Sequence, residues 1–188
     1  MNRTGALTIG IAAVWLLVLG GFAISAQDAA PGKYTVSVPG GLAFSEFKGY
    51  EAWQTISLSR TERVVAAILG NPEMIAAYRA GIPANGKPVP DGAKMAKVHW
   101  KPKPNAFFPT ATVPGDLVNV DFMAKDSRRF ADSGGWGYAV FDYDTASDTF
   151  TPGTTAGTPP QGNDARCGFA CHTKAKTRDY VFTEYGKR

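Results

Sequence analysis

Residues 136–143 read WGYAVFDY, a run of aromatic, β-branched and small side chains that is typical of a β-strand. Three stretches upstream have a similar character and are mostly bounded by Gly, Pro or Asp: 63–69 (RVVAAIL), 93–100 (AKMAKVHW) and 118–124 (VNVDFMA). We interpret 118–124 and 136–143 as antiparallel strands around the core. Period-two alternation divides the 93–100 strand into two faces. One face carries Met95, Lys97 and His99, and the other carries Ala96, Val98 and Trp100.

Two short helices are expected beside these strands. The clearer one covers residues 72–80, because Asn71 suits the N-cap, a proline follows at the first helical position and Gly81 suits the stop. Asp126 is a candidate cap for a second helix over residues 127–130. The pattern therefore predicts an α+β fold, an antiparallel β-sheet with a few packed helices.

Composition favours a packed, globular domain and excludes several classes of protein. The chain has 188 residues, of which 44% are hydrophobic and 19% charged. Twenty Lys and Arg against sixteen Asp and Glu give a net charge of only +4, and the basic residues are scattered, so we expect no nucleic-acid partner. Two cysteines and two histidines exclude a scaffold stapled by several disulfides and a four-cysteine zinc site.

The N-terminus has the pattern of a secretory signal. Arg3 is followed by a largely apolar, uncharged run over residues 5–24 and by small residues ending at Ala26. The alternative is an uncleaved anchor, because about 20 apolar residues can cross a bilayer core of roughly 30 Å. Both interpretations place the remaining chain outside the cytoplasm, in a bacterial periplasm. We divide the chain into a signal peptide or anchor (1–26), a leader and domain start (27–49) and one compact domain (50–188).

The chemistry is concentrated in residues 166–172, which read RCGFACH. Two cysteines followed by a histidine are typical of c-type haem attachment, in which the thiols form thioethers and the imidazole binds the iron. Cys167 and Cys171 are separated by three residues instead of the standard two, and Gly168 could absorb the bulge. The alternative is a local Cys167–Cys171 disulfide with His172 as a bystander.

Several motifs, in order, resemble the cytochrome P-460 and cytochrome c′-beta family. They are Pro90-Asp91-Gly92 before a lysine-bearing strand, Asp126-Ser127-Arg128-Arg129-Phe130, Gly135-Trp136-Gly137-Tyr138, and Cys171-His172 followed by Asp179-Tyr180-Val181-Phe182-Thr183. The resemblance covers residues 50–185, so it implies that 50–188 is a haem domain. It further implies a small periplasmic protein, mainly β with helices and usually dimeric, with covalent haem c, proximal ligand His172 and an open distal side.

The two branches of that family imply different functions. In the P-460 branch a lysine is bonded to the porphyrin edge and the enzyme oxidises hydroxylamine. In the c′-beta branch that bond is absent and the protein binds nitric oxide or carbon monoxide. The position of the family's lysine relative to the Asp-Gly pair points to Lys97, with Lys94, Lys101 and Lys103 as rivals.

Other residues are candidates for a haem pocket by type alone. Oxidation of a bound nitrogen compound releases protons, so a base helps, and the carboxylates considered are Glu46, Glu62, Asp121 and Asp142. Phe107 and Phe108 could wall the pocket, although core or loop packing is the more usual role of such residues. His99 is the second imidazole of the chain, and we do not expect it to be a distal ligand.

Three functional hypotheses follow. The first is a haem enzyme that oxidises hydroxylamine or a related nitrogen compound and passes electrons to a periplasmic acceptor. The second is a non-catalytic haem protein that binds nitric oxide or carries electrons. The third is a haem-free exported domain closed by a local disulfide.

Overall fold

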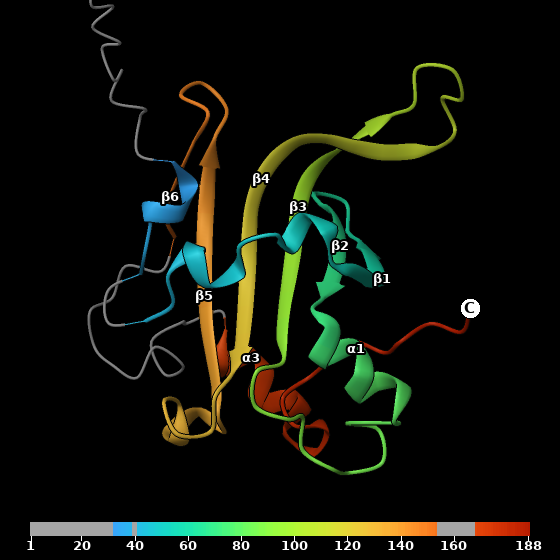
Figure 1. Cartoon of the computed structure of the whole chain (residues 1–188). Coiled ribbons are helices and arrows are strands. Elements are labelled where there is room, and N and C mark those ends of the chain that lie inside the picture. Colours follow the sequence, from blue (N-terminus) through green and yellow to red (C-terminus); the bar gives the residue numbers. More distant parts are fainter. Residues whose placement is uncertain (1–31, 39–40, 154–167) are drawn as a thin grey trace, which may run out of the picture.

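A computed structural model describes residues 32–38, 41–153 and 168–188. Its centre is one six-stranded sheet in the order β1-β2-β3-β4-β5-β6, in which every neighbouring pair is antiparallel (Figure 1). A few short helices pack on this sheet. The predicted α+β fold class is therefore confirmed. The predicted signal segment, residues 1–26, lies outside the described residues.

The elements have the following bounds. The strands are β1 (Gln54–Arg60), β2 (Val65–Gly70), β3 (Lys94–Pro104), β4 (Thr112–Lys125), β5 (Trp136–Asp144) and β6 (Thr149–Pro152). The α-helices are α1 (Pro72–Arg79) and α3 (Phe169–His172), and the 3-10 helices are η1 (Lys33–Thr35), η2 (Phe44–Phe47), η3 (Tyr50–Ala52), η4 (Ala131–Ser133) and η5 (Thr173–Arg178).

The four predicted strands correspond to β2, β3, β4 and β5. The pattern missed the two edge strands. β1 reads QTISLSR and is half polar, which weakens the hydrophobic signal, and β6 has only four residues.

Helix α1 begins where its cap predicts. The Asn71 side chain accepts a hydrogen bond from the backbone N–H of Met74 at 3.0 Å, and Gly81 follows the helix with a φ of +78°. Asn71 also accepts from the N–H of Lys94 at 2.9 Å, so the same side chain ties the helix to β3.

The prediction of a second helix over residues 127–130 is wrong. Asp126 does cap the segment, because its carboxylate accepts from the N–H groups of Arg128 and Arg129. However, the chain forms only a hydrogen-bonded turn, closed by Phe130 N–H to the Asp126 carbonyl, and continues into η4. The left-handed Gly134 and Gly135 then turn it into β5, which stops helix growth after one turn.

One face of the sheet is covered by the N-terminal segment. In Figure 1 its blue and cyan turns cross the strands. Phe44 and Phe47 are fully buried and pack on Phe122 of β4, with ring centroids 5.2 and 3.9 Å away. Since this segment supplies part of the hydrophobic core, the folded domain includes residues well before residue 50.

The opposite face is covered by α1 and the C-terminal segment. Met95 and Met123 are paired across β3 and β4 and belong to a second core cluster with Met74 of α1 and Val181. The alternation predicted for residues 93–100 is therefore confirmed, because Met95 and Ala96 fall in different clusters. The functional site lies on the Met95 face.

The expectation that Phe107 and Phe108 wall a pocket or pack in the core is wrong. They lie in the connection between β3 and β4, where their side chains are 98% and 66% exposed. The β3–β4 hairpin extends away from the rest of the sheet in Figure 1. The two rings therefore contribute neither to the core nor to a pocket wall. Within the residues that the structure describes, no helix combines the length and apolar character needed to cross a membrane.

Candidate functional site

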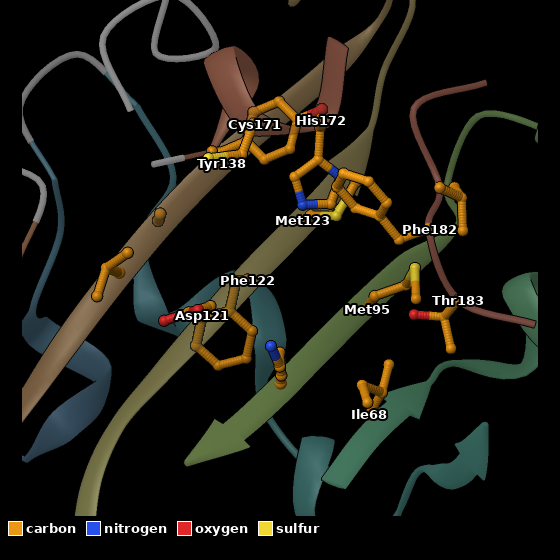
Figure 2. Close-up of a pocket in the computed structure, with 15 residues that line it drawn as sticks. Ile68, Met95, Asp121, Phe122, Met123, Tyr138, Cys171, His172, Phe182 and Thr183 are labelled. Atoms are coloured by element: carbon orange, nitrogen blue, oxygen red, sulfur yellow. The ribbon is translucent and has the colours of Figure 1, made fainter. Parts of the chain in front are cut away.

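A cavity of about 280 Å³ lies between the Met95 face of the sheet and the C-terminal segment. Figure 2 shows His172 and Cys171 on that segment, facing strands that carry Asp121 and Met95. A second, more open hollow of about 400 Å³ adjoins it and extends the site towards β1, because both hollows share Lys97, His172 and Phe182. The cavity is lined by Ile68, Met95, Lys97, Asp121, Phe122, Met123, Tyr138, Ala139, Val140, Gly168, Cys171, His172, Val181, Phe182 and Thr183.

The strand register explains why these sheet residues meet. Lys97 of β3 is paired with Ile68 of β2 and with Asp121 of β4, and Asp121 is paired with Val140 of β5. Directly paired residues in antiparallel strands project from the same face. One row across four strands therefore carries an amine and a carboxylate between two aliphatic side chains.

His172 presents a neutral imidazole to this cavity. Its Nδ1 lies 2.5 Å from the carbonyl oxygen of Tyr180, which can only accept, so Nδ1 carries the proton and Nε2 is the free nitrogen. Burial lowers the pKa of His172, and the nearby Lys97 acts in the same direction, whereas the bond to Tyr180 opposes them. This is the form in which histidine binds metals, usually with its other nitrogen fixed by a carbonyl or carboxylate.

Asp121 carries the buried carboxylate of the site. The side chain is 38% exposed as a whole, but its Oδ1 atom is buried and has no hydrogen-bond partner among the described residues. Its Oδ2 atom lies 3.6 Å from His99 Nδ1. Desolvation raises the pKa of Asp121, and the opposite effects of His99 and Lys97 are smaller. An acceptor that lacks a donor inside a cavity is suited to take a proton from a bound ligand.

The other candidate carboxylates lie elsewhere. Glu46 accepts hydrogen bonds from Arg129 at 2.8 Å and from the N–H of Ala43 at 2.8 Å, on the opposite side of the sheet. Glu62 is exposed in the β1–β2 turn, and Asp142 is exposed on β5. Of the four carboxylates, the structure brings only Asp121 to the cavity.

The candidate lysines separate in the same way. Lys94 donates to the carbonyl of Glu46 at 2.7 Å, on the opposite face of the sheet. Lys101 pairs with Asp116 at 3.7 Å in the outer part of the β3–β4 hairpin, and Lys103 is exposed there. Lys97 is the only one of these four that lines the cavity.

Tyr138 is a site residue that the sequence patterns did not single out. Its ring centroid lies 5.1 Å from that of His172, and its hydroxyl is buried without a hydrogen-bond partner among the described residues. Burial raises the pKa of Tyr138, so the hydroxyl stays protonated. Its alternation with Trp136 along β5 places it on a buried face, but this pattern alone does not distinguish a cavity wall from core.

Of the two motif cysteines, Cys171 is described and Cys167 lies outside the described residues. Cys171 lines the cavity and is an exposed residue. It forms no disulfide to any described residue. Its thiol is therefore accessible from the cavity. The predicted thioether at Cys167, and the predicted effect of the longer spacing, stay predictions.

His99 does not line the cavity, although it shares a strand face with Lys97. Its Nδ1 lies 2.5 Å from the side-chain oxygen of Asn119, the residue paired with it on β4. His99 therefore packs beside Asp121 without facing the ligand space.

The motifs upstream of the cysteines act as connectors in the fold. Asp91 accepts from the N–H of Ser127 at 2.8 Å and from its hydroxyl at 2.6 Å, which ties the turn before β3 to the turn after β4. Gly137 gives the Phe130 ring room, since a Cβ there would lie 2.3 Å from it. These contacts hold the ends of β3, β4 and β5 together beside the site.

The arrangement fits a haem group. The walls are mostly apolar, as a porphyrin requires, and one neutral imidazole is oriented to bind iron through Nε2. An accessible thiol stands next to that imidazole in the chain. The partnerless Asp121 Oδ1 and Tyr138 hydroxyl are the polar atoms that such a cavity leaves for a bound group.

Comparison with known proteins agrees with this geometry. A family model described as Cytochrome P460 matches residues 47–183, which is most of the chain and includes every described strand and residues 168–183 near the C-terminus. No curated protein sequence matches the chain. The match makes this a haem protein of the cytochrome P460 type, with iron in its cofactor. The chain belongs to the cytochrome P460 family.

Proposed function

We propose that this protein is a periplasmic c-type haem enzyme that oxidises hydroxylamine or a related small nitrogen compound. The observation that carries the proposal is the convergence of Lys97, Asp121 and His172 on one cavity. An amine, a proton acceptor and an iron ligand are the groups that a lysine-modified, catalytic haem needs from the protein. The export of the chain follows from the N-terminal sequence pattern.

In this proposal the C-terminal segment holds the cofactor. Cys167 and Cys171 bond the porphyrin as thioethers, and His172 binds iron through the Nε2 atom that its bond to Tyr180 leaves free. The accessible thiol of Cys171 and the neutral imidazole next to it support this assignment. Covalent attachment prevents loss of haem outside the cytoplasm.

Lys97 is proposed to bond the porphyrin edge. The side chain approaches the cavity from β3, while His172 approaches from the opposite wall. Its three lysine rivals contact other parts of the fold or are exposed. Lys97 is therefore the candidate for this bond. The new C–N bond replaces one N–H bond of the amine and one C–H bond of the porphyrin, so its formation releases two protons and passes two electrons to an external oxidant.

In the proposed reaction, the electrons of the substrate go to haem and its protons go to the protein. When bound, haem supplies the redox-active iron that draws electrons from the substrate nitrogen. Each pair of electrons removed from hydroxylamine is accompanied by two protons, and the electrons leave to an external periplasmic acceptor. Asp121 accepts a proton at its carboxylate, which belongs to the lining of the cavity. Its raised pKa moves it nearer to neutral pH, where a general base is more effective.

A non-catalytic, c′-beta-like function is the second candidate. The observation in its favour is the apolar character of the walls, to which Ile68, Met95 and Met123 contribute. Such walls suit a diatomic gas such as nitric oxide, which needs little hydrogen bonding. Dimerisation, proposed by family analogy, is compatible with either function.

The test is turnover by the haem-loaded protein. We expect hydroxylamine to reduce a one-electron acceptor repeatedly in the presence of catalytic amounts of protein, with more than one equivalent consumed per haem. Binding of nitric oxide without any hydroxylamine-dependent reduction of the acceptor would instead favour the second candidate. A matched preparation without hydroxylamine controls for reduction of the acceptor by the protein itself.

A further inference from the structure

Lys125 and Asp179 form a buried ion pair directly behind the cavity. Lys125 Nζ lies 2.9 and 2.8 Å from the two carboxylate oxygens of Asp179, and the two side chains are 6% and 14% exposed. The ammonium also donates to the carbonyl of Gly134 at 2.9 Å, and the N–H of Val89 donates to the carboxylate at 2.8 Å. Burying two charges has a high desolvation cost, so an apolar pair would often be as stable. This cost suggests a role for the pair beyond stability.

The pair holds an unusual stretch of backbone. Asp179 and Tyr180 have φ values of +49° and +65°, in the left-handed region that a bulky side chain rarely adopts. Residues in this conformation are strained and persist only where their surroundings hold them. Two hydrogen bonds, one from a side chain and one within the backbone, support the turn. Trp136 Nε1 donates to the Asp179 carbonyl at 2.8 Å, and Tyr180 N–H donates to the Ala175 carbonyl at 2.9 Å.

The Tyr180 ring is fixed by the same region. It packs over Gly134, where a Cβ atom would lie only 2.2 Å from the ring. Gly134 is also the residue whose carbonyl accepts from Lys125. The ion pair, Gly134 and the left-handed turn are therefore connected to one another. Together they fix the orientation of the Tyr180 carbonyl, which accepts a hydrogen bond from His172 Nδ1 at 2.5 Å.

We infer that the Lys125–Asp179 ion pair is a positioning device for the imidazole of His172. By fixing the Tyr180 carbonyl, it keeps the Nδ1 hydrogen bond short and so sets how strongly Nε2 donates to haem iron. The inference rests on the proposed role of His172 as the proximal ligand. Outer partners of metal-binding histidines orient the ring and raise its basicity, and their loss commonly costs roughly 10- to 100-fold in metal affinity or activity.

A firmly hydrogen-bonded imidazole is a stronger donor to iron. It strengthens the iron–nitrogen bond and stabilises ferric over ferrous iron. Loss of the support must therefore weaken the iron–histidine bond and raise the reduction potential. Neither Lys125 nor Asp179 lines the cavity, so these effects would have to pass through Tyr180 and His172.

The experiment compares haem-loaded variants by resonance Raman spectroscopy in the ferrous state and by redox titration. The double variant K125M/D179N removes both charges without leaving one buried alone. D179N is a second variant: its amide oxygen can still accept from the N–H of Val89, but the Lys125 charge stays buried without its carboxylate. We expect the iron–histidine stretching frequency to fall in both variants, and the midpoint potential to rise in the double variant, whose net charge equals that of the wild type. K125R keeps the ion pair and should resemble the wild type.

The control pair is Arg129–Glu46, an ion pair of 2.8 Å on the opposite side of the sheet. The variant E46Q/R129M should leave both signals unchanged, even if the protein becomes less stable. An unshifted frequency in D179N, or an unshifted frequency and potential in K125M/D179N, overturns the inference. H172A separates this result from failure of the proposed function. If H172A retains the wild-type iron–histidine band, His172 is not the ligand; if it loses the band, only the role of the ion pair is refuted.

Discussion

Lys97 and Asp121 lie directly opposite each other on β3 and β4, and both line the cavity that His172 borders. The pairing has an electrostatic consequence. The Lys97 ammonium favours the ionised form of Asp121, while desolvation disfavours it and has the larger effect. A bond between Lys97 and a porphyrin would replace the ammonium by an amine on an aromatic ring, which is much less basic. The same bond would therefore raise the pKa of Asp121 further.

The first prediction concerns the identity of the base. Asp121→Asn removes the proton acceptor with almost no change in shape, and general-base catalysis typically contributes roughly 10²- to 10⁴-fold. We expect hydroxylamine oxidation to slow by at least about 10²-fold, with haem content unchanged. The matched control is Asp116→Asn, an exposed aspartate in the outer part of β4 that should retain wild-type activity. Equal activities of the two variants would show that Asp121 is not the base.

The second prediction concerns pH. Only the ionised carboxylate accepts a proton, so activity should fall as pH decreases through the pKa of Asp121. Burial raises that pKa above the ordinary value of about 3.9, so the acid limb of the rate profile should lie at higher pH than for an exposed aspartate. The profile of kcat against pH checks this. Persistence of the same acid limb in Asp121→Asn would assign it to another group.

The third prediction concerns the close contact at Gly134. Gly134 and Gly86 have similar positive φ values of +70° and +76°, so alanine at either position carries comparable backbone strain of roughly 1–2 kcal/mol. Only at Gly134 would the new Cβ meet another group, the Tyr180 ring. We expect Gly134→Ala to lower the free energy of unfolding by about 1–3 kcal/mol more than Gly86→Ala. Denaturant unfolding measures the difference, and equal losses would contradict the contact.

The fourth prediction concerns the connection between Asp91 and Ser127. Hydrogen bonds from Ser127 lower the pKa of Asp91 in the folded protein. A lowered pKa means that the stabilisation is fully present above the unfolded value of about 3.9 and is lost as pH falls through the folded value. The difference in Tm between wild type and Asp91→Asn should therefore shrink as pH is lowered from 7 towards 2. A constant difference over this range would exclude the ionised carboxylate as its cause.

Much of the sheet could be predicted from the sequence because the signals are local. Alternation in residues 93–100 placed Lys97 with Met95, and the structure confirms the shared face. The Asn71 cap and the Gly81 stop likewise act within one helix. The edge strands escaped prediction because a half-polar or very short strand carries a weak pattern.

The support of the site could not be predicted in this way, because its contacts join distant parts of the chain. Lys125 and Asp179 are 54 residues apart, and nothing local to either residue specifies the partner. Phe107 and Phe108 illustrate the converse error. Their hydrophobicity suggested packing, but both side chains are exposed in the connection between β3 and β4. The type of a side chain indicates whether it favours burial, whereas the arrangement of the strands and turns determines which residues it contacts.

In the proposed holoprotein, haem is covalently held in this cavity by the cysteine motif and by Lys97. The most direct measurement is peptide-mapping mass spectrometry on protein exported from a host that matures c-type cytochromes, with Lys97→Arg and Lys101→Arg beside the wild type. We predict haem mass that joins the Cys167–Cys171 peptide to the Lys97 peptide in the wild type and in Lys101→Arg, and to the cysteine peptide alone in Lys97→Arg. Haem on the cysteine peptide alone in the wild type would contradict the cross-link. A haem-free cysteine peptide, two hydrogens lighter than its reduced form, would contradict covalent haem attachment and the function proposed from it, and would indicate a Cys167–Cys171 disulfide.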